Sequence, residues 1–156
     1  MNTAHPDIIV VSPDGEYLIV VKVKLTNGNH LQDVDALEQL KSVMASFGCS
    51  NGLLVTGNFI FILRDSFEKS HGESIYLVGK AKLPEFLLPS VGEQWQQERA
   101  MEFELRVQQW LEHLKQPSSL QMLPKDLRTL LEGHIINRLR FGDIRAARLR
   151  EVRVVS

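Results

Sequence analysis

Three charged side chains stand at the ends of two apolar segments near the start of the chain. Asp7 opens the first segment, and Lys22 and Lys24 close the second. Both segments are rich in β-branched residues, which predicts two strands, and the sequence SPDG at 12–15 between them is typical of a hairpin turn. Two lysines that are two residues apart lie on one face of a strand. Such a pair indicates a nearby anion, either a carboxylate of the same chain or a phosphate from a partner.

The length of the hairpin loop decides whether Asp7 joins the two lysines. A four-residue loop, 13–16, places Asp7 directly opposite Lys22, and a two-residue loop places it opposite Val20 on the same face. A three-residue loop turns Asp7 to the other face. Directly opposed residues have Cβ atoms roughly 5 Å apart, so two of these three registers predict a cluster of one carboxylate and two ammonium groups. The simplest role for Asp7 and Lys22 is a cross-strand ion pair, which contributes about 0–1 kcal/mol to stability when it is exposed.

The elements that position these residues follow from hydrophobic periodicity and from turn residues. Apolar residues at helical spacing after the hairpin predict an amphipathic helix that ends at Gly48, and apolar runs around the Gly57-Asn58 turn predict further strands. The expected order is strands at 7–11 and 17–25, a helix at 31–47, and strands at 52–56, 59–64 and 74–78. This order is typical of the mixed α/β class.

This segment resembles a known family in five respects, which are Pro6-Asp7, the hairpin, the strand that ends in Lys24, the helix that carries Gln39, and the strand pair GLLVTGNFIFIL at 52–63. The family is the restriction-endonuclease-like PD-(D/E)XK nuclease superfamily, and the resemblance covers about residues 5–65. It implies a restriction-endonuclease-like core of order β-β-α-β-β, to which the C-terminal helices are additions.

The chemistry of that superfamily is phosphodiester hydrolysis by a divalent cation, usually Mg²⁺, held by two carboxylates and assisted by a lysine. The resemblance implies that Asp7 is the first carboxylate and Lys24 the lysine, but Lys22 stands where the second carboxylate is expected. An ammonium group at that position replaces the metal electrostatically and implies a degenerate site. Some relatives carry the second acid on the following helix, fourteen positions after the lysine, which is Glu38 here. In that alternative Asp7 and Glu38 hold the metal.

Three functions are compatible with the candidate site residues Asp7, Lys22, Lys24, Glu38 and Gln39. The first is a nuclease-like domain with a degenerate metal site and no cofactor, which acts as a nucleic-acid-binding or assembly module. The second is an active Mg²⁺-dependent DNA endonuclease that uses Asp7, Glu38 and Lys24. The third is a homo-oligomeric interaction protein without a nucleic-acid role. Glu38 and Gln39 suit a solvated helix face equally well.

The chain divides into a core at 1–82, a linker at 83–91 that contains Pro84 and Pro89, and a helical extension at 92–156 that packs on the core or on a partner subunit. The extension is expected to contain helices at 92–116 and 125–140, a break at Pro117, an interruption near Gly133 and a short strand at 152–155.

Arginine is abundant at the end of this extension. Six arginines stand against Asp143 and Glu151, which gives a local charge of +4, and they are Arg138, Arg140, Arg145, Arg148, Arg150 and Arg153. Guanidinium groups bind phosphate, so nucleic acid is one expected partner. The glutamates of the helix at 92–116 nearly cancel this charge, which favours pairing within the chain or between subunits. We therefore expect a homo-oligomer.

Composition narrows the class of protein. The 156 residues carry a net charge of −1 and are 44% hydrophobic and 24% charged, values typical of a globular domain without a global positive field. A single cysteine, Cys49, excludes an internal disulfide and suits a reducing compartment. No apolar run is long enough to cross a bilayer, and no charged-then-apolar leader opens the chain. We expect a cytoplasmic protein without membrane association.

Overall fold

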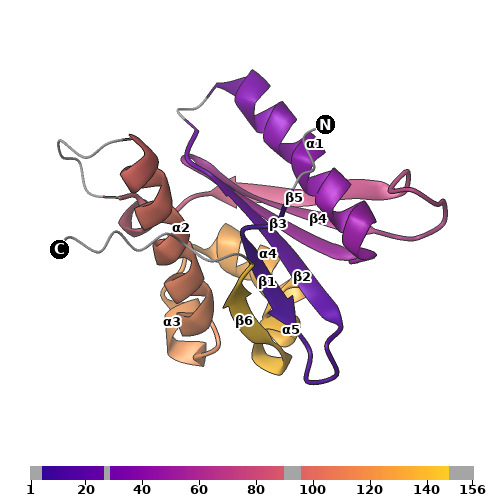
Figure 1. Ribbon diagram of the computed structural model, residues 1–156. Coiled ribbons are helices and arrows are strands. Elements are labelled where there is room, and N and C mark those ends of the chain that lie inside the picture. The colour runs from indigo at the N-terminus through magenta and orange to yellow at the C-terminus, as the bar shows by residue number, and fades with distance from the viewer. Residues whose placement is uncertain (1–4, 27–28, 90–95, 148–156) are drawn as a thin grey trace, which may run out of the picture.

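The computed structural model describes residues 5–26, 29–89 and 96–147 (Figure 1). In these residues a six-stranded mixed sheet is flanked by five α-helices and one short 3₁₀ helix, which confirms the mixed α/β class. The strands are β1 (Ile8–Val11), β2 (Tyr17–Lys24), β3 (Asn51–Thr56), β4 (Phe59–Asp65), β5 (Ile75–Lys82) and β6 (Asp143–Ala146). The helices are α1 (His30–Phe47), η1 (Glu85–Leu87), α2 (Gln96–His113), α3 (Pro117–Gln121), α4 (Lys125–His134) and α5 (Ile136–Phe141).

The strands are arranged in the order β5-β4-β3-β2-β1-β6. Among them, β2 and β3 form a parallel pair that is connected through α1, and the other neighbouring strands are antiparallel. The sequence-based order of strand, strand, helix, strand, strand is therefore observed, with β5 extending four residues beyond the predicted end at 78.

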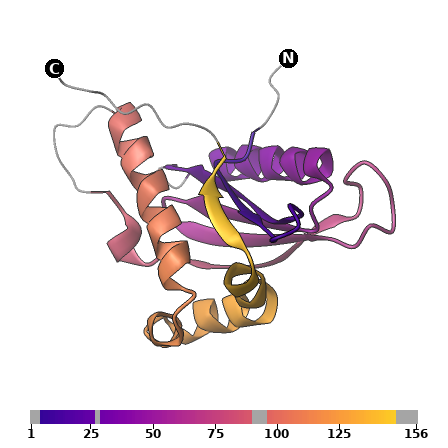
Figure 2. The same cartoon turned by 60° about the horizontal axis from the view of Figure 1, so that its bottom comes forward.

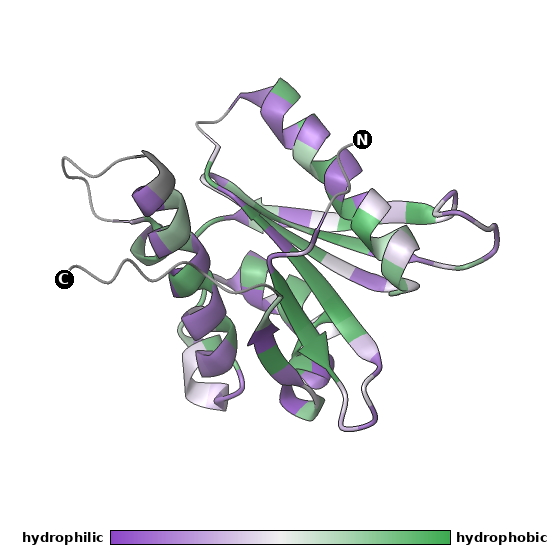
Figure 3. Cartoon of the chain, in the orientation of Figure 1, coloured by the Kyte–Doolittle hydropathy of each residue, from purple (hydrophilic) through white to green (hydrophobic). Residues whose placement is uncertain are grey.

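Helices cover the sheet on both faces (Figure 2). One face packs against α1, and its apolar cluster includes Val20, Leu40 and Leu54. The other face packs against α2, α4 and α5, and its larger cluster joins strand residues such as Ile8 and Leu53 to helix residues. The apolar colouring of the central strands in Figure 3 reflects this burial on two sides. A strand covered on both faces is expected to be continuously apolar, as IIVV and LIVV are.

The hairpin between β1 and β2 has the predicted register, but it has a three-residue loop and a bulge in place of a four-residue loop. Ser12 pairs with Glu16 through a backbone hydrogen bond of 2.8 Å, which leaves a three-residue loop. A bulge at Leu18 then shifts the pairing by one residue, so that Ile8 lies opposite Val21. Because a bulge adds one residue to one strand, it reverses the change of face that the three-residue loop imposes. Asp7 therefore comes beside Lys22, as the four-residue loop predicts, whereas Lys24 pairs with Asp35 of α1.

The two ends of α1 are fixed by local contacts. The side chain of Asn29 accepts a hydrogen bond from the backbone N–H of Leu31, and Gly48 ends the helix with a positive φ of 60°. At the start of the helix, the hydroxyl of Thr26 donates to the buried carboxylate of Asp33 at 3.1 Å. The caps fix where α1 begins and ends, and the contact of Asp33 with Thr26 ties the start of α1 to the segment that follows β2.

The C-terminal half contains features that the sequence did not indicate. β6 pairs with β1 at the edge of the sheet, and α3 begins at Pro117, where a break was expected. The expected helix at 125–140 is two helices that meet at Ile135 rather than at Gly133. The expected helix residues at 92–95 and the expected strand at 152–155 lie outside the described residues.

The apolar face of α2 is buried within the chain. Phe103, Val107 and Leu111 are fully buried, and they belong to the same cluster as the strand residues of the sheet. The described part of the extension therefore packs on the core of its own chain. None of the helices in the described residues is long and apolar enough to cross a membrane.

Candidate functional site

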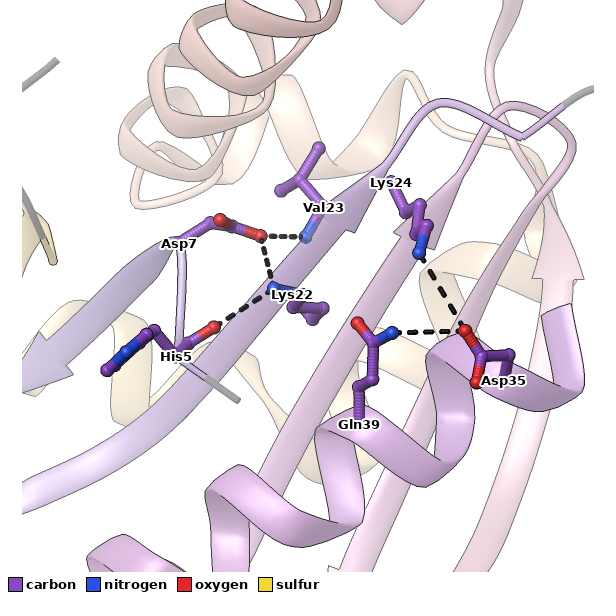
Figure 4. Close-up of polar contacts among 7 residues, drawn as sticks. All are labelled: His5, Asp7, Lys22, Val23, Lys24, Asp35 and Gln39. Atoms are coloured by element: carbon purple, nitrogen blue, oxygen red, sulfur yellow. Dashed lines mark hydrogen bonds and ion pairs between the residues drawn. The ribbon is translucent and has the colours of Figure 1, made fainter. Parts of the chain in front are cut away.

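A cavity of about 320 Å³ lies at the carboxyl end of β2, and its lining joins the residue before β1 to residues of β2, α1 and α2. It contains four of the five predicted site residues, and its lining consists of Asp7, Lys22, Val23, Lys24, Leu25, Gln39 and Ala100. The close-up in Figure 4 shows Asp7 and Lys22 together on one side, and Lys24 near the residues of α1 on the other.

Asp7 is the buried acid of this site. Its side chain is 5% exposed, and one carboxylate oxygen, Oδ2, accepts a hydrogen bond of 2.7 Å from the backbone N–H of Val23. The same oxygen lies 3.8 Å from the Nζ atom of Lys22. The acid is held in place from two sides and points toward the cavity rather than away from the lysines.

Lys22 lies between two oxygen atoms. Its Nζ atom donates a hydrogen bond of 3.1 Å to the backbone carbonyl of His5, in addition to the ion pair with Asp7. Its side chain is only 17% exposed. A carboxylate and a backbone carbonyl are ligands that hard divalent cations prefer, and here both face an ammonium group.

The pKa of Asp7 is raised from its ordinary value of 3.8 to about 6. Burial is the largest cause, because it disfavours the charged carboxylate. The hydrogen bond from Val23 and the charge of Lys22 act in the opposite direction, and the nearby carboxyl group of Glu104 raises the pKa further.

Glu104 is a member of this environment that the sequence analysis missed. It lies on α2, is 7% exposed, and its side chain hydrogen-bonds with that of Asp7. No spacing rule connects Glu104 to Asp7, because the contact depends on how α2 packs against the sheet. Its sequence position does place it beside Phe103 in an amphipathic helix, which could have indicated a position at the border of the buried face.

Lys24 and Gln39 form the more open side of the cavity. The Nζ atom of Lys24 lies 3.9 Å from Oδ2 of Asp35, and Nε2 of Gln39 donates to the same oxygen at 3.1 Å. The side chain of Lys24 is 41% exposed and that of Asp35 is 68% exposed, so this ion pair is accessible to solvent and weak. An incoming anion could therefore replace Asp35 as the partner of Lys24.

Glu38 lies outside this cavity. Its side chain is 66% exposed and pairs with Lys41 at 3.2 Å, one turn along α1. The resemblance implied that Glu38 and Asp7 share a metal ion, and the structure directs Glu38 to a different partner.

The residues of the cavity do not fit a magnesium site. In the described ranges no group of three or more His, Cys, Asp or Glu side chains could hold a metal ion. The one carboxylate that lines the cavity already faces Lys22. Oxygen ligands of Mg²⁺ need near-octahedral geometry, which an ammonium group at this distance obstructs.

The predicted arginine-rich surface is only partly described. Arg145 pairs with Asp143 at 2.7 Å, and Arg138 donates to the backbone carbonyl of His134 at 3.1 Å. Arg148, Arg150 and Arg153 lie outside the described residues.

No protein-family model matches this sequence, and no curated protein or solved structure shows significant similarity to it.

Proposed function

We propose that this chain is a restriction-endonuclease-like domain whose metal site is degenerate and that it binds nucleic acid by its phosphates without cleaving it. The observation that carries the proposal is the position of Lys22, whose ammonium group lies between the carboxylate of Asp7 and the carbonyl of His5. These are oxygens that would otherwise suit a divalent cation. A tethered positive charge at that point leaves the cavity suited to an anion.

The location of the cavity supports this proposal. In open α/β sheets, ligands bind in the crevice outside the carboxyl ends of parallel strands. The cavity lies at the carboxyl end of β2, which is one member of the β2–β3 parallel pair, and residues from both faces of the sheet line it. The order of strand, strand, helix, strand, strand along the chain is the one that the resemblance implies, and the family part of the proposal rests on that resemblance.

The charge of the cavity supports it as well. Two ammonium groups, those of Lys22 and Lys24, line it together with the carboxyl group of Asp7, and the exposed Asp35 that pairs with Lys24 is not part of the lining. The amide of Gln39 adds a hydrogen-bond donor and an acceptor beside Lys24. A lysine binds phosphate as a point charge, so two lysines on one strand face provide a site for one or two phosphates.

Phosphate binding predicts a defined effect of lysine substitution. Binding of a fluorescein-labelled 20-nucleotide DNA is measured by fluorescence anisotropy at several salt concentrations. Because each phosphate contact contributes about one to the slope of log affinity against log salt, Lys24→Ala and Lys22→Ala should each reduce that slope by about one. Lys125→Ala, which removes an exposed lysine on α4, is the matched control and should leave the slope unchanged. Equal slopes in all four proteins would exclude the cavity as the phosphate site.

The degenerate metal site predicts that DNA is not cleaved. Supercoiled plasmid incubated with the protein and Mg²⁺ or Mn²⁺ should remain supercoiled. Nicking that disappears in Asp7→Ala would contradict the proposal and indicate an active nuclease.

Restoring a second acid should restore a cation site if the geometry is that of the family. In Lys22→Glu, two carboxylates and the carbonyl of His5 replace the ammonium group. Calorimetric titration with Mn²⁺ should then show binding that the wild-type protein lacks. A folded Lys22→Glu protein that binds no Mn²⁺ would show that these oxygens do not converge.

A further inference from the structure

A second cavity of about 410 Å³ lies along the same β1–β2 ribbon and differs from the first in chemistry. It is lined by His5, Pro6, Ile9, Tyr17, Phe47 and Ala147. Three of these residues carry aromatic rings, and no lysine or arginine is among them. Its volume lies in the range of about 300–1,000 Å³ that is typical of ligand sites.

The two cavities are neighbours along the β1–β2 ribbon. Asp7 lines the first, and Ile9, two residues along the strand and on the same face, lines the second. On β2, Tyr17 lies five residues before Lys22, which at the usual strand rise is about 17 Å. His5 connects the cavities directly, because it lines the second while its carbonyl accepts the hydrogen bond from Lys22.

Tyr17 is an exposed ring that is already held in position. It is 43% exposed, and its ring contacts that of Phe47 edge to face, with centroids 4.8 Å apart and planes at 68°. A side chain fixed in this way loses little conformational freedom when a ligand stacks on it. The cavity also leaves Ile9 only partly buried, on a part of the sheet face beside α1.

We propose that the two cavities form one groove for single-stranded nucleic acid, in which a phosphate binds at Lys22 and Lys24 and a base farther along the same strand stacks in the cavity of Tyr17 and His5. This inference rests on the proposed phosphate-binding function and adds the class of ligand. Bases in a duplex are paired and stacked inside the helix, so an aromatic cavity close to a phosphate site can receive only an unpaired base. Lysines next to an aromatic slot are the combination that single-strand-binding proteins use.

The test compares one labelled oligonucleotide, an eight-nucleotide oligothymidine, with the same strand annealed to its complement. Fluorescence anisotropy should show tighter binding of the single strand. Tyr17→Ala should weaken single-strand binding about tenfold, because stacking of one base is lost. Tyr76→Ala is the matched control, since Tyr76 is 49% exposed on β5 and lines neither cavity; it should bind as the wild type does. Tyr17→Phe, which keeps the ring, should also retain affinity.

An oligonucleotide of the same length with abasic residues tests the groove without any substitution in the protein. It keeps the phosphates but has no bases, so wild-type affinity for it should fall to that of Tyr17→Ala for oligothymidine. Equal affinities for single strand, duplex and abasic strand would overturn this inference and leave phosphate binding intact. Loss of all binding to nucleic acid would instead overturn the proposed function. Tighter, Tyr17-dependent binding of an oligoglutamate peptide would assign the groove to an acidic protein partner and would overturn the inference as well.

Discussion

Asp7 is a carboxyl group whose neighbours pull its pKa in opposite directions. Burial and the carboxyl group of Glu104 raise it, while the N–H of Val23 and the ammonium of Lys22 lower it, and the result is about 6. A pKa above the ordinary 3.8 means that the folded protein binds a proton more tightly than the unfolded chain does. The folded state is therefore favoured by this residue in acid, and the benefit is lost as the pH rises from about 3.8 to about 6.

Replacing Asp7 with Asn should remove that pH dependence. Above pH 7 the wild-type protein carries a buried charge that the amide lacks, so Asp7→Asn should gain stability relative to wild type by an amount on the order of 2–3 kcal/mol. At pH 4 the two proteins should be nearly equal. Urea denaturation at pH 4, 6 and 8 measures the difference. Titrating groups that do not contact Asp7 cancel because both proteins share them, whereas Glu104, which hydrogen-bonds with Asp7, contributes to the difference. A difference that does not change with pH would mean that Asp7 has an ordinary pKa in the folded protein.

At this scale the sequence predicted part of the site. Strand periodicity predicted that Asp7 and Lys22 share a face in two of the three loop lengths considered. The sequence did not predict the bulge at Leu18, because a shorter loop with a bulge gives the same register as a longer loop without one. The contact with Glu104 was not predictable, since it depends on the packing of α2. The same limitation applies to Glu38, whose pairing with Lys41 depends on the rotation of α1 over the sheet.

At the scale of elements, strong local signals predicted the strands and α1 to within one or two residues at most ends. β6 was missed because the sequence DIRA is short, half polar and follows a helix, and only its pairing with β1 makes it a strand. α3 was missed because Pro117 stands at the first position of that helix, where proline is favourable rather than disruptive.

Two glycines should respond in opposite ways to the same substitution. A Cβ atom on Gly57 would collide with the backbone oxygen of Thr26, so Gly57→Ala should destabilise the fold by about 1–3 kcal/mol. Gly133 is in α4 with nothing within 4 Å of the new atom, so Gly133→Ala should stabilise the fold by about 0.5–1 kcal/mol. Urea denaturation of both variants gives the two values. Stabilisation by Gly57→Ala would show that the β2–α1 connection differs from the one described.

At the scale of the whole molecule, the sheet shares one large apolar cluster with the C-terminal helices. Ile8, Ile19 and Leu53 are fully buried, and their cluster includes residues of α2, α4 and α5. The division into a core at 1–82 and an extension at 92–156 is a sequence-based expectation. Because the two parts share this cluster, the division can be tested by asking whether the first part folds without the second.

A fragment of residues 1–91 should not fold on its own. Without the helices, one whole face of the sheet would expose apolar side chains, and β1 would lose its pairing with β6. We expect the fragment to bind the dye ANS and to unfold without a cooperative transition, in contrast to the full chain. A cooperative transition for the fragment, measured by circular dichroism, would establish that residues 1–91 contain an independent domain.

The pairing of β1 with β6 also affects when the cavity can form during synthesis of the chain. The backbone carbonyl of Asp7 accepts a hydrogen bond of 3.0 Å from the N–H of Ala147, and Ile8 lies opposite Ala146. A nascent chain on the ribosome therefore holds the residues of the cavity long before it has synthesised the segment that anchors their strand. If the cavity is a binding site, its ligand should consequently bind only after β6 has left the exit tunnel and paired with β1.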